Sequence, residues 1–293
     1  MTMNKLKVVT YNMRYDCKED GKNNFEYRKP YIIRKIKEKS PDIIGFQEML
    51  PHMKVWFEES FPEYNLVGCG RAKDYTDEHN AIAYRKDTFE LFGLETFWLS
   101  PTPYLPGSRF EEQSICPRVC TVALLKHKNG IKPIRVYNTH LDHEGEQARL
   151  LGIGLVLERI KQDYECFPLP SLLMGDFNAS PDCKEIQVIE EDGILEDTTK
   201  GIEYTFHNFG KPQDFIKIDY IYKSKEFICD QIGVWDDVEE GIYLSDHYPV
   251  GIRIDQKGCL IMRQLFLRNL QVYIKRANQR TVKYVKFKTS KSI

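Results

Sequence analysis

The sequence has no apolar stretch approaching the roughly 18 uncharged residues that would indicate a transmembrane helix. Its N-terminal segment also lacks the apolar run of a signal peptide. Hydrophobic residues make up 42% of the 293 residues and charged residues 29%, a composition that excludes a largely disordered chain or a fibre. These features predict a globular protein with a cytoplasmic localisation.

Cysteine is scarce and scattered, which argues against a disulfide scaffold. The eight cysteines form none of the Cys-x-x-Cys pairs that zinc sites use, so we expect reduced thiols. The chain also lacks the Gly-x-Ser-x-Gly motif of serine hydrolases and the Gly-x-x-x-x-Gly-Lys motif that cradles phosphates. The sequence therefore does not favour a serine or cysteine nucleophile, or a P-loop.

Acidic residues are absent after Asp255, and this marks the clearest boundary in the chain. Residues 257–293 contain ten of the 42 basic residues, which leaves 32 basic residues against all 43 acidic ones, a net charge of −11, in residues 1–256. We predict a catalytic domain over 1–256 and a basic C-terminal tail over 257–293. The tail contacts nucleic acid or anionic membrane, or is a solvated appendage. The acidic body lacks the basic face expected of a protein that tracks long duplex DNA.

Short β-branched runs alternate with helical patterns along the body, as expected of an α/β fold. The number of strands predicts two sheets packed together, with helices outside, in one domain. A loop is predicted between about residues 100 and 117, which include four prolines. Strands are predicted at 6–11, 42–46, 80–84, 119–125, 134–138, 171–175, 218–221 and 249–254, and helices at 27–39 and 144–161.

Polar or ionisable residues stand beside six of these apolar runs, where side chains from adjacent strands would converge on one rim. Each has a structural alternative, because Asp and Asn favour caps and turns and a carboxylate is favoured at a helix start. Six such sites on one rim indicate a functional cluster instead. The sites are Thr10-Tyr11-Asn12, Gln47-Glu48, Asn138-Thr139-His140, Gly175-Asp176-Phe177-Asn178, Ile218-Asp219 and Ser245-Asp246-His247.

Carboxylates and amides are hard oxygen ligands, which suit Mg²⁺ or Mn²⁺ better than zinc. With histidine and asparagine beside them, they suit the attack of water on a phosphate ester. In such a reaction a metal neutralises developing charge, a carboxylate orients or deprotonates water, and a charged histidine binds the phosphate.

These six motifs, in this order between about residues 5 and 255, resemble the motif set of the endonuclease/exonuclease/phosphatase superfamily. The resemblance is to its compact bacterial-type branch, near the deadenylases. It implies a four-layer α/β sandwich, in which two mixed β-sheets pack face to face between helices and the active site lies at one edge.

The resemblance also implies the ligands of a Mg²⁺ cofactor, with Mn²⁺ as the alternative. Glu48 would be the principal ligand, Asn12 would lie beside it, and Asp246 would be a further ligand or a water-mediated partner. Arg118 would contact the phosphate of the substrate, although an arginine that enters a strand is often a surface ion-pair partner.

The same resemblance implies five catalytic residues. Asp176 would orient or deprotonate the attacking water, and Asn178 would hold the scissile phosphate. His247 would contact the phosphate and be kept protonated by Asp219, since a neighbouring carboxylate raises the pKa of a histidine. His140 would stabilise the phosphoryl oxygens from the other side.

The substrate is less closely defined. The sequence predicts a phosphodiesterase or nuclease acting on a small phosphodiester or a single-stranded nucleic acid. The alternatives are a phosphomonoesterase and a lipid-headgroup phosphodiesterase at a membrane surface, with a non-catalytic binding module as a further one. The segment Asp214–Asp219 does not match the Pro-Ala-Trp-x-Asp-Arg motif of inositol-phosphate phosphatases. Oligomeric state is not predicted.

Overall fold

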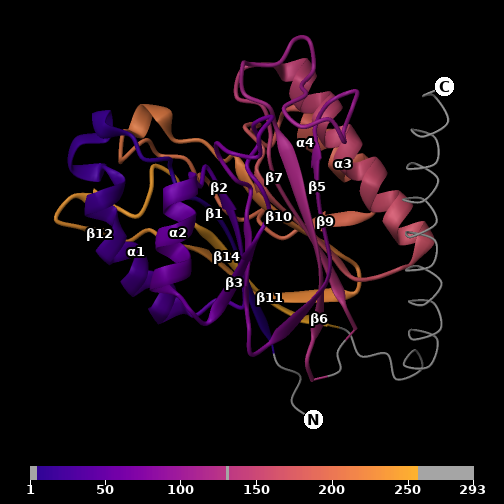
Figure 1. Cartoon of the computed structure of the whole chain (residues 1–293), viewed down its shortest axis with the longest axis horizontal. Coiled ribbons are helices and arrows are strands. Elements are labelled where there is room, and N and C mark those ends of the chain that lie inside the picture. Colours follow the sequence, from indigo (N-terminus) through magenta and orange to yellow (C-terminus); the bar gives the residue numbers. More distant parts are fainter. Residues whose placement is uncertain (1–4, 130–131, 257–293) are drawn as a thin grey trace, which may run out of the picture.

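The computed structural model of the protein describes residues 5–129 and 132–256. The predicted basic tail at 257–293 lies outside the described residues, so the domain boundary at 256 stays a prediction. Among the residues described, no helix is both long and apolar enough to cross a membrane. The described chain forms four layers, with two β-sheets in the middle and helices on both outer faces (Figure 1).

The first sheet has six strands, and only its central pair β1 and β2 is parallel. A parallel pair needs a crossover connection, which helix α1 provides between these two strands. The order across the sheet is β11 (Phe227–Val234), β14 (Val250–Gln256), β1 (Leu6–Asn12), β2 (Ile43–Gln47), β4 (Ile82–Arg85) and β3 (Tyr64–Val67).

The second sheet repeats this plan, with β7 and β8 as its parallel pair and helix α3 as their crossover. Its other pairs are antiparallel. The order is β5 (Phe89–Trp98), β6 (Val119–His127), β7 (Ile134–His140), β8 (Ser171–Asp176), β10 (Asp219–Ser224) and β9 (Leu195–Asp197). The remaining strands, β12 (Val238–Glu239) and β13 (Ile242–Tyr243), pair with each other.

Two helices cover each sheet on its outer face (Figure 1). Helices α1 (Phe25–Lys39) and α2 (Pro51–Ser60) lie on the first sheet, and α3 (Glu146–Cys166) and α4 (Lys184–Asp192) lie on the second. Short 3₁₀ helices occupy Lys18–Asn23 and Pro212–Asp214. The predicted four-layer α/β sandwich, two packed mixed sheets flanked by helices, is confirmed.

The core follows from the alternation of side chains along each strand. In β1, Val8 packs between the sheets while Val9 packs outward beneath the helices. From the second sheet, Val136 and Leu172 contribute to the same inter-sheet core. β1 and β2 face β7 and β8 across this core, so both parallel pairs bring their carboxyl ends to one edge of the sandwich.

A polar side chain joins the two sheets near that edge. The Asn138 amide on β7 donates to the carbonyl oxygens of Phe46 (2.8 Å) and Ala81 (2.9 Å), and its oxygen accepts from Gln47 Nε2 (2.7 Å). A Cβ at Gly45 would lie 2.8 Å from the Asn138 oxygen, so the glycine permits this close approach. These bonds fix the strand ends of one sheet against those of the other.

Candidate active site

All nine residues predicted for the site lie at this edge, in or just beyond strand ends. Asn12 ends β1, His140 ends β7 and Asp176 ends β8, while Glu48 follows β2 directly. Asp219 begins β10, which is antiparallel to β8, and pairs with Asp176 in register. The other members are Arg118 before β6, Asn178 after β8, and Asp246 and His247 before β14.

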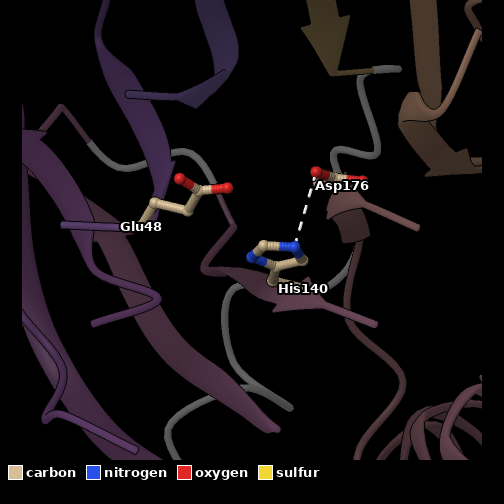
Figure 2. A group of neighbouring side chains, drawn as sticks. All are labelled: Glu48, His140 and Asp176. Carbon is tan, nitrogen blue, oxygen red and sulfur yellow. Dashed lines mark ion pairs between the residues drawn. The ribbon is translucent and has the colours of Figure 1, made fainter. Parts of the chain in front are cut away.

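Glu48 points toward His140 and Asp176 across a common space, as Figure 2 shows. Asn12 Nδ2 lies 2.9 Å from Glu48 Oε1 and 3.0 Å from Asp176 Oδ2, so one amide bridges the two carboxylates. The backbone N–H of Tyr15 donates to Glu48 Oε2 at 3.0 Å. Burial alone would raise the pKa of Glu48, but these hydrogen bonds and the charge of His247 outweigh it and lower the pKa. Glu48 is therefore a carboxylate at neutral pH.

Asp176 lies at the centre of the cluster. Its Oδ2 is 3.5 Å from His140 Nε2 and 3.8 Å from His247 Nε2. Burial and the neighbouring charge of Asp219 raise the pKa of Asp176 to about 7. A carboxyl group with a pKa near the working pH is suited to exchanging a proton with water.

The two histidines have opposite electrostatic environments. His247 Nδ1 is 2.8 Å from Asp219 Oδ2. Burial alone would lower the pKa of His247, but Asp219, Asp176 and Asp246 outweigh it and raise the pKa to about 10. Burial and the nearby charges of Arg118 and Arg71 instead lower the pKa of His140 well below its usual value. His247 is therefore a cation in the metal-free site, and His140 is a neutral imidazole.

The donor set fits a hard divalent cation. Ligand atoms of Glu48, His140 and Asp176 all lie within 4.8 Å of one another, and so do those of Asp176, Asp219 and His247. Asp246 lies outside both groups. Its Oδ2 is 3.6 Å from Arg14 Nε, and burial, together with the charge of Glu48, raises its pKa despite the charge of His247. Crowded, buried carboxylates are stabilised by a cation, and oxygen donors favour Mg²⁺ or Mn²⁺.

Two residues of the site follow strand ends in the left-handed backbone conformation, which non-glycine residues adopt rarely. Glu48 has φ 59° and Asn178 has φ 48°. The backbone N–H of Asn178 donates to Asp176 Oδ1 (2.9 Å), and its side-chain amide donates to the carbonyl of Leu141 (3.1 Å). Local strain of this kind is concentrated at functional sites.

Sequence reasoning missed several residues that support the site. The guanidinium of Arg28, fully buried, donates to the carbonyls of Met13 (2.6 Å), Arg14 (2.9 Å) and Leu244 (2.9 Å). It thereby joins the loop after Asn12 to the loop before Asp246. The sequence also did not indicate the ion pair of Arg71 and Glu78, in which Nη1 lies 2.8 Å from Oε2. No pattern in one sequence distinguishes these arginines from surface ones.

The chain is similar in sequence to a known protein family and in fold to several solved structures. Residues 9–247 match the model described as "Endonuclease/Exonuclease/phosphatase family". The crystal structure of an endonuclease/exonuclease/phosphatase from Bacteroides vulgatus is similar at 32% identity and a TM-score of 0.81, over 86% of this chain and 99% of that one. A mannosyl-6-phosphatase from Bacteroides thetaiotaomicron is similar at 31% identity and a TM-score of 0.78, over 85% and 99%. An uncharacterized protein of Acanthamoeba polyphaga mimivirus is 25% identical over 78% of this chain and 91% of its own length.

Proposed function

The chain belongs to the endonuclease/exonuclease/phosphatase family, and on that premise we propose that it is a Mg²⁺- or Mn²⁺-dependent phosphoesterase. The observation that carries this proposal is the position of Asp176. Its carboxylate lies within 3.0–3.8 Å of Asn12, His140 and His247, and Asn12 also contacts Glu48. Metal ligands, a proton acceptor and a phosphate-binding cation are thus side by side, as hydrolysis of a phosphate ester requires.

Each residue has a role in this proposal. Glu48 and Asn12 would hold the metal, with Asp246 as a further ligand or a water-mediated partner, and the bound metal would neutralise negative charge on the phosphoryl group. Asp176, with its pKa of about 7, orients water and accepts its proton. Water attacks in line with the leaving oxygen.

The phosphate is held by the remaining residues. His247 donates from Nε2 to a phosphoryl oxygen while Asp219 fixes its Nδ1. His140 contacts the phosphate from the other side as a neutral donor, and Asn178 holds the phosphate through its side chain. Arg118 supplies a second positive charge.

Three classes of phosphate ester are candidate substrates. The sequence predicts a small phosphodiester or single-stranded nucleic acid rather than a long duplex, since the body is acidic. The similarity to a mannosyl-6-phosphatase, at 31% identity over most of both chains, instead supports a phosphomonoester. A lipid headgroup at an anionic membrane stays a third possibility, for which the tail is the relevant feature.

The first test is hydrolysis of p-nitrophenyl phosphate and bis-p-nitrophenyl phosphate, with and without Mg²⁺ or Mn²⁺. We expect activity that needs metal and falls by roughly 10²- to 10³-fold in Glu48→Ala and His247→Ala, the size seen when one charge-stabilising group is removed. Glu203→Ala, outside the site, is a control that should keep wild-type activity.

Calorimetry with Mn²⁺ separates metal binding from catalysis. Glu48→Ala should lose metal affinity, whereas His247→Ala should keep it. Metal-independent activity, or activity that survives both substitutions, would contradict the proposal.

A further inference from the structure

Arg118 is a buried cation whose hydrogen-bonding capacity the protein leaves partly unused. The residue is 4% exposed, and its Nη2 contacts His143 Nδ1 at 2.9 Å. Its Nε is buried and has no hydrogen-bond partner within the described part of the chain. Glu78 and Asp142 act on it only as longer-range charges.

Arg28, another buried arginine of this protein, has its guanidinium hydrogen-bonded within the fold. Arg28 donates from all three of its nitrogens, to four backbone carbonyls. Burying a charge is costly unless its partners are present. Within the described residues, the Arg118 side chain has one hydrogen-bond contact, with His143, and its Nε has none, so the described chain does not fully satisfy this buried cation.

Arg118 lies close to the candidate active site, next to His140. Arg118 is among the charges that lower the pKa of His140, and Arg71 is another. His140 Nδ1 is itself buried without a partner in the described residues. Arg118 precedes β6, and the register of β6 with β7 brings this strand end beside that of His140. Two unsatisfied polar groups therefore adjoin the site on one side.

Charge favours a doubly negative ligand at this position. Burial and the adjacent charge of Arg71 lower the pKa of the Arg118 guanidinium, so the two arginines repel each other. Arg71 is partly neutralised by its ion pairs with Glu78 and Asp77, whereas Arg118 forms no ion pair with any residue that the structure describes. A terminal phosphate ester carries two negative charges at neutral pH, and a phosphodiester carries one.

We propose that Arg118, with Arg71 behind it, makes this site selective for the dianionic phosphate of a phosphomonoester over a phosphodiester. The inference rests on the proposed phosphoesterase function and specifies its substrate class. The guanidinium donates to a terminal phosphoryl oxygen that in a diester would carry the second ester carbon. Arg118 is thus a specificity-determining residue, and the leaving alcohol extends away from it.

The test compares two substrates that share one leaving group, p-nitrophenyl phosphate and methyl p-nitrophenyl phosphate, at pH 8 with Mg²⁺. We expect the wild type to prefer the monoester. Arg118→Gln should lower kcat/KM for the monoester by roughly 10- to 100-fold, the size of one lost charge-assisted hydrogen bond, and change the diester rate by about threefold or less. Arg118→Lys should fall between wild type and Arg118→Gln.

Arg85→Gln is the matched control, because Arg85 lies in the ion pair with Asp87 next to the other end of β2. It should leave both rates unchanged. A wild type that prefers the diester, or equal losses on both substrates in Arg118→Gln, would overturn the inference while leaving the phosphoesterase function intact.

A binding measurement decides the inference if neither ester is hydrolysed. Calorimetry at pH 8 with Mg²⁺ should show inorganic phosphate, mainly a dianion, binding the wild type at least tenfold more tightly than Arg118→Gln. Dimethyl phosphate, a monoanion, should bind both proteins equally weakly. No difference between the two proteins for inorganic phosphate would refute the role of Arg118.

Discussion

At the scale of single residues, the candidate site gives Asp176 and its neighbour His247 very different pKa values. Asp219 and Asp176 pair with each other in the sheet, yet burial and the charge of Asp219 raise the pKa of Asp176 to about 7. The same carboxylates raise the pKa of His247 to about 10 against the opposing effect of burial. Acid and base roles are assigned when environments push the pKa values of adjacent groups apart. One carboxylate can then accept a proton while the histidine keeps its own.

The Asp219→Asn substitution tests this assignment. It removes the charge that holds the proton on His247, so the pKa of His247 should fall by more than one pH unit. The alkaline limb of the kcat/KM profile should therefore move to lower pH by about the same amount. Steady-state rates between pH 5 and 10.5 measure this shift.

Asp230→Asn is the control for that experiment, because Asp230 pairs with Arg253 on the surface. Its profile should match the wild type. An unchanged alkaline limb in Asp219→Asn would mean that catalysis does not need the positive charge on His247. The raised pKa of His247 also makes the free energy of unfolding depend on pH. In the metal-free protein, the stabilisation from the His247–Asp219 pair is complete below about pH 6.5 and is lost as pH rises through about 10.

At the scale of elements, the parallel pairs β1–β2 and β7–β8 position the site. The sequence predicted all four of these strands, because each is a short, continuous apolar run bounded by polar residues. It missed β5, where glutamates interrupt the run and the register shifts between Leu91 and Gly93. It also missed the short helices α2 and α4. The missed elements cover or flank the sheets and carry none of the nine predicted site residues.

Gly175→Ala tests how the second parallel pair holds Asp176. Gly175 has φ 149°, and a Cβ there would lie 1.8 Å from the carbonyl oxygen of Thr139 on β7. The strands must separate to admit it, which displaces the next residue, Asp176. We expect the free energy of unfolding to fall by about 2 kcal/mol or more, as measured with urea, and kcat/KM to fall in the folded protein.

The control is Gly154→Ala in α3, where a Cβ would meet nothing within 4 Å. Alanine is the better helix former, so this variant should be more stable by about 0.5–1 kcal/mol. A Gly175→Ala protein with wild-type stability and activity would show that β7 and β8 tolerate the added atom.

At the scale of the whole molecule, charge divides the chain into an acidic catalytic body and the basic segment 257–293. The described body contains three cores, one between the sheets and one beneath each helical layer. The last strand of the first sheet, β14, ends at Gln256. Both six-stranded sheets form within the described residues, which end at 256, and we expect the tail to contribute binding rather than catalysis.

Truncation after Gln256 tests this division. The shortened protein should keep its melting temperature and hydrolyse p-nitrophenyl phosphate within about twofold of the full chain, because the tail supplies none of the proposed site residues. Salt-sensitive binding to anionic vesicles or to single-stranded RNA should be lost, since ten basic residues are removed. A truncated protein that fails to fold would contradict the predicted boundary, and unchanged binding would exclude the tail as the contact.

The family, the layered architecture and the residues that lie at the edge of the sandwich could all be predicted from the sequence. Ordered motifs beside apolar runs carry that information, because strand ends and the polar side chains beside them are set by the local sequence. The contacts between these side chains, in contrast, follow only from the tertiary structure. The bridge from Asn12 to Glu48 and Asp176, the different charge states of the two histidines and the unsatisfied Arg118 depend on distances between segments far apart in the chain. Burial and charge proximity, which set these pKa values, exist only once the two sheets have packed.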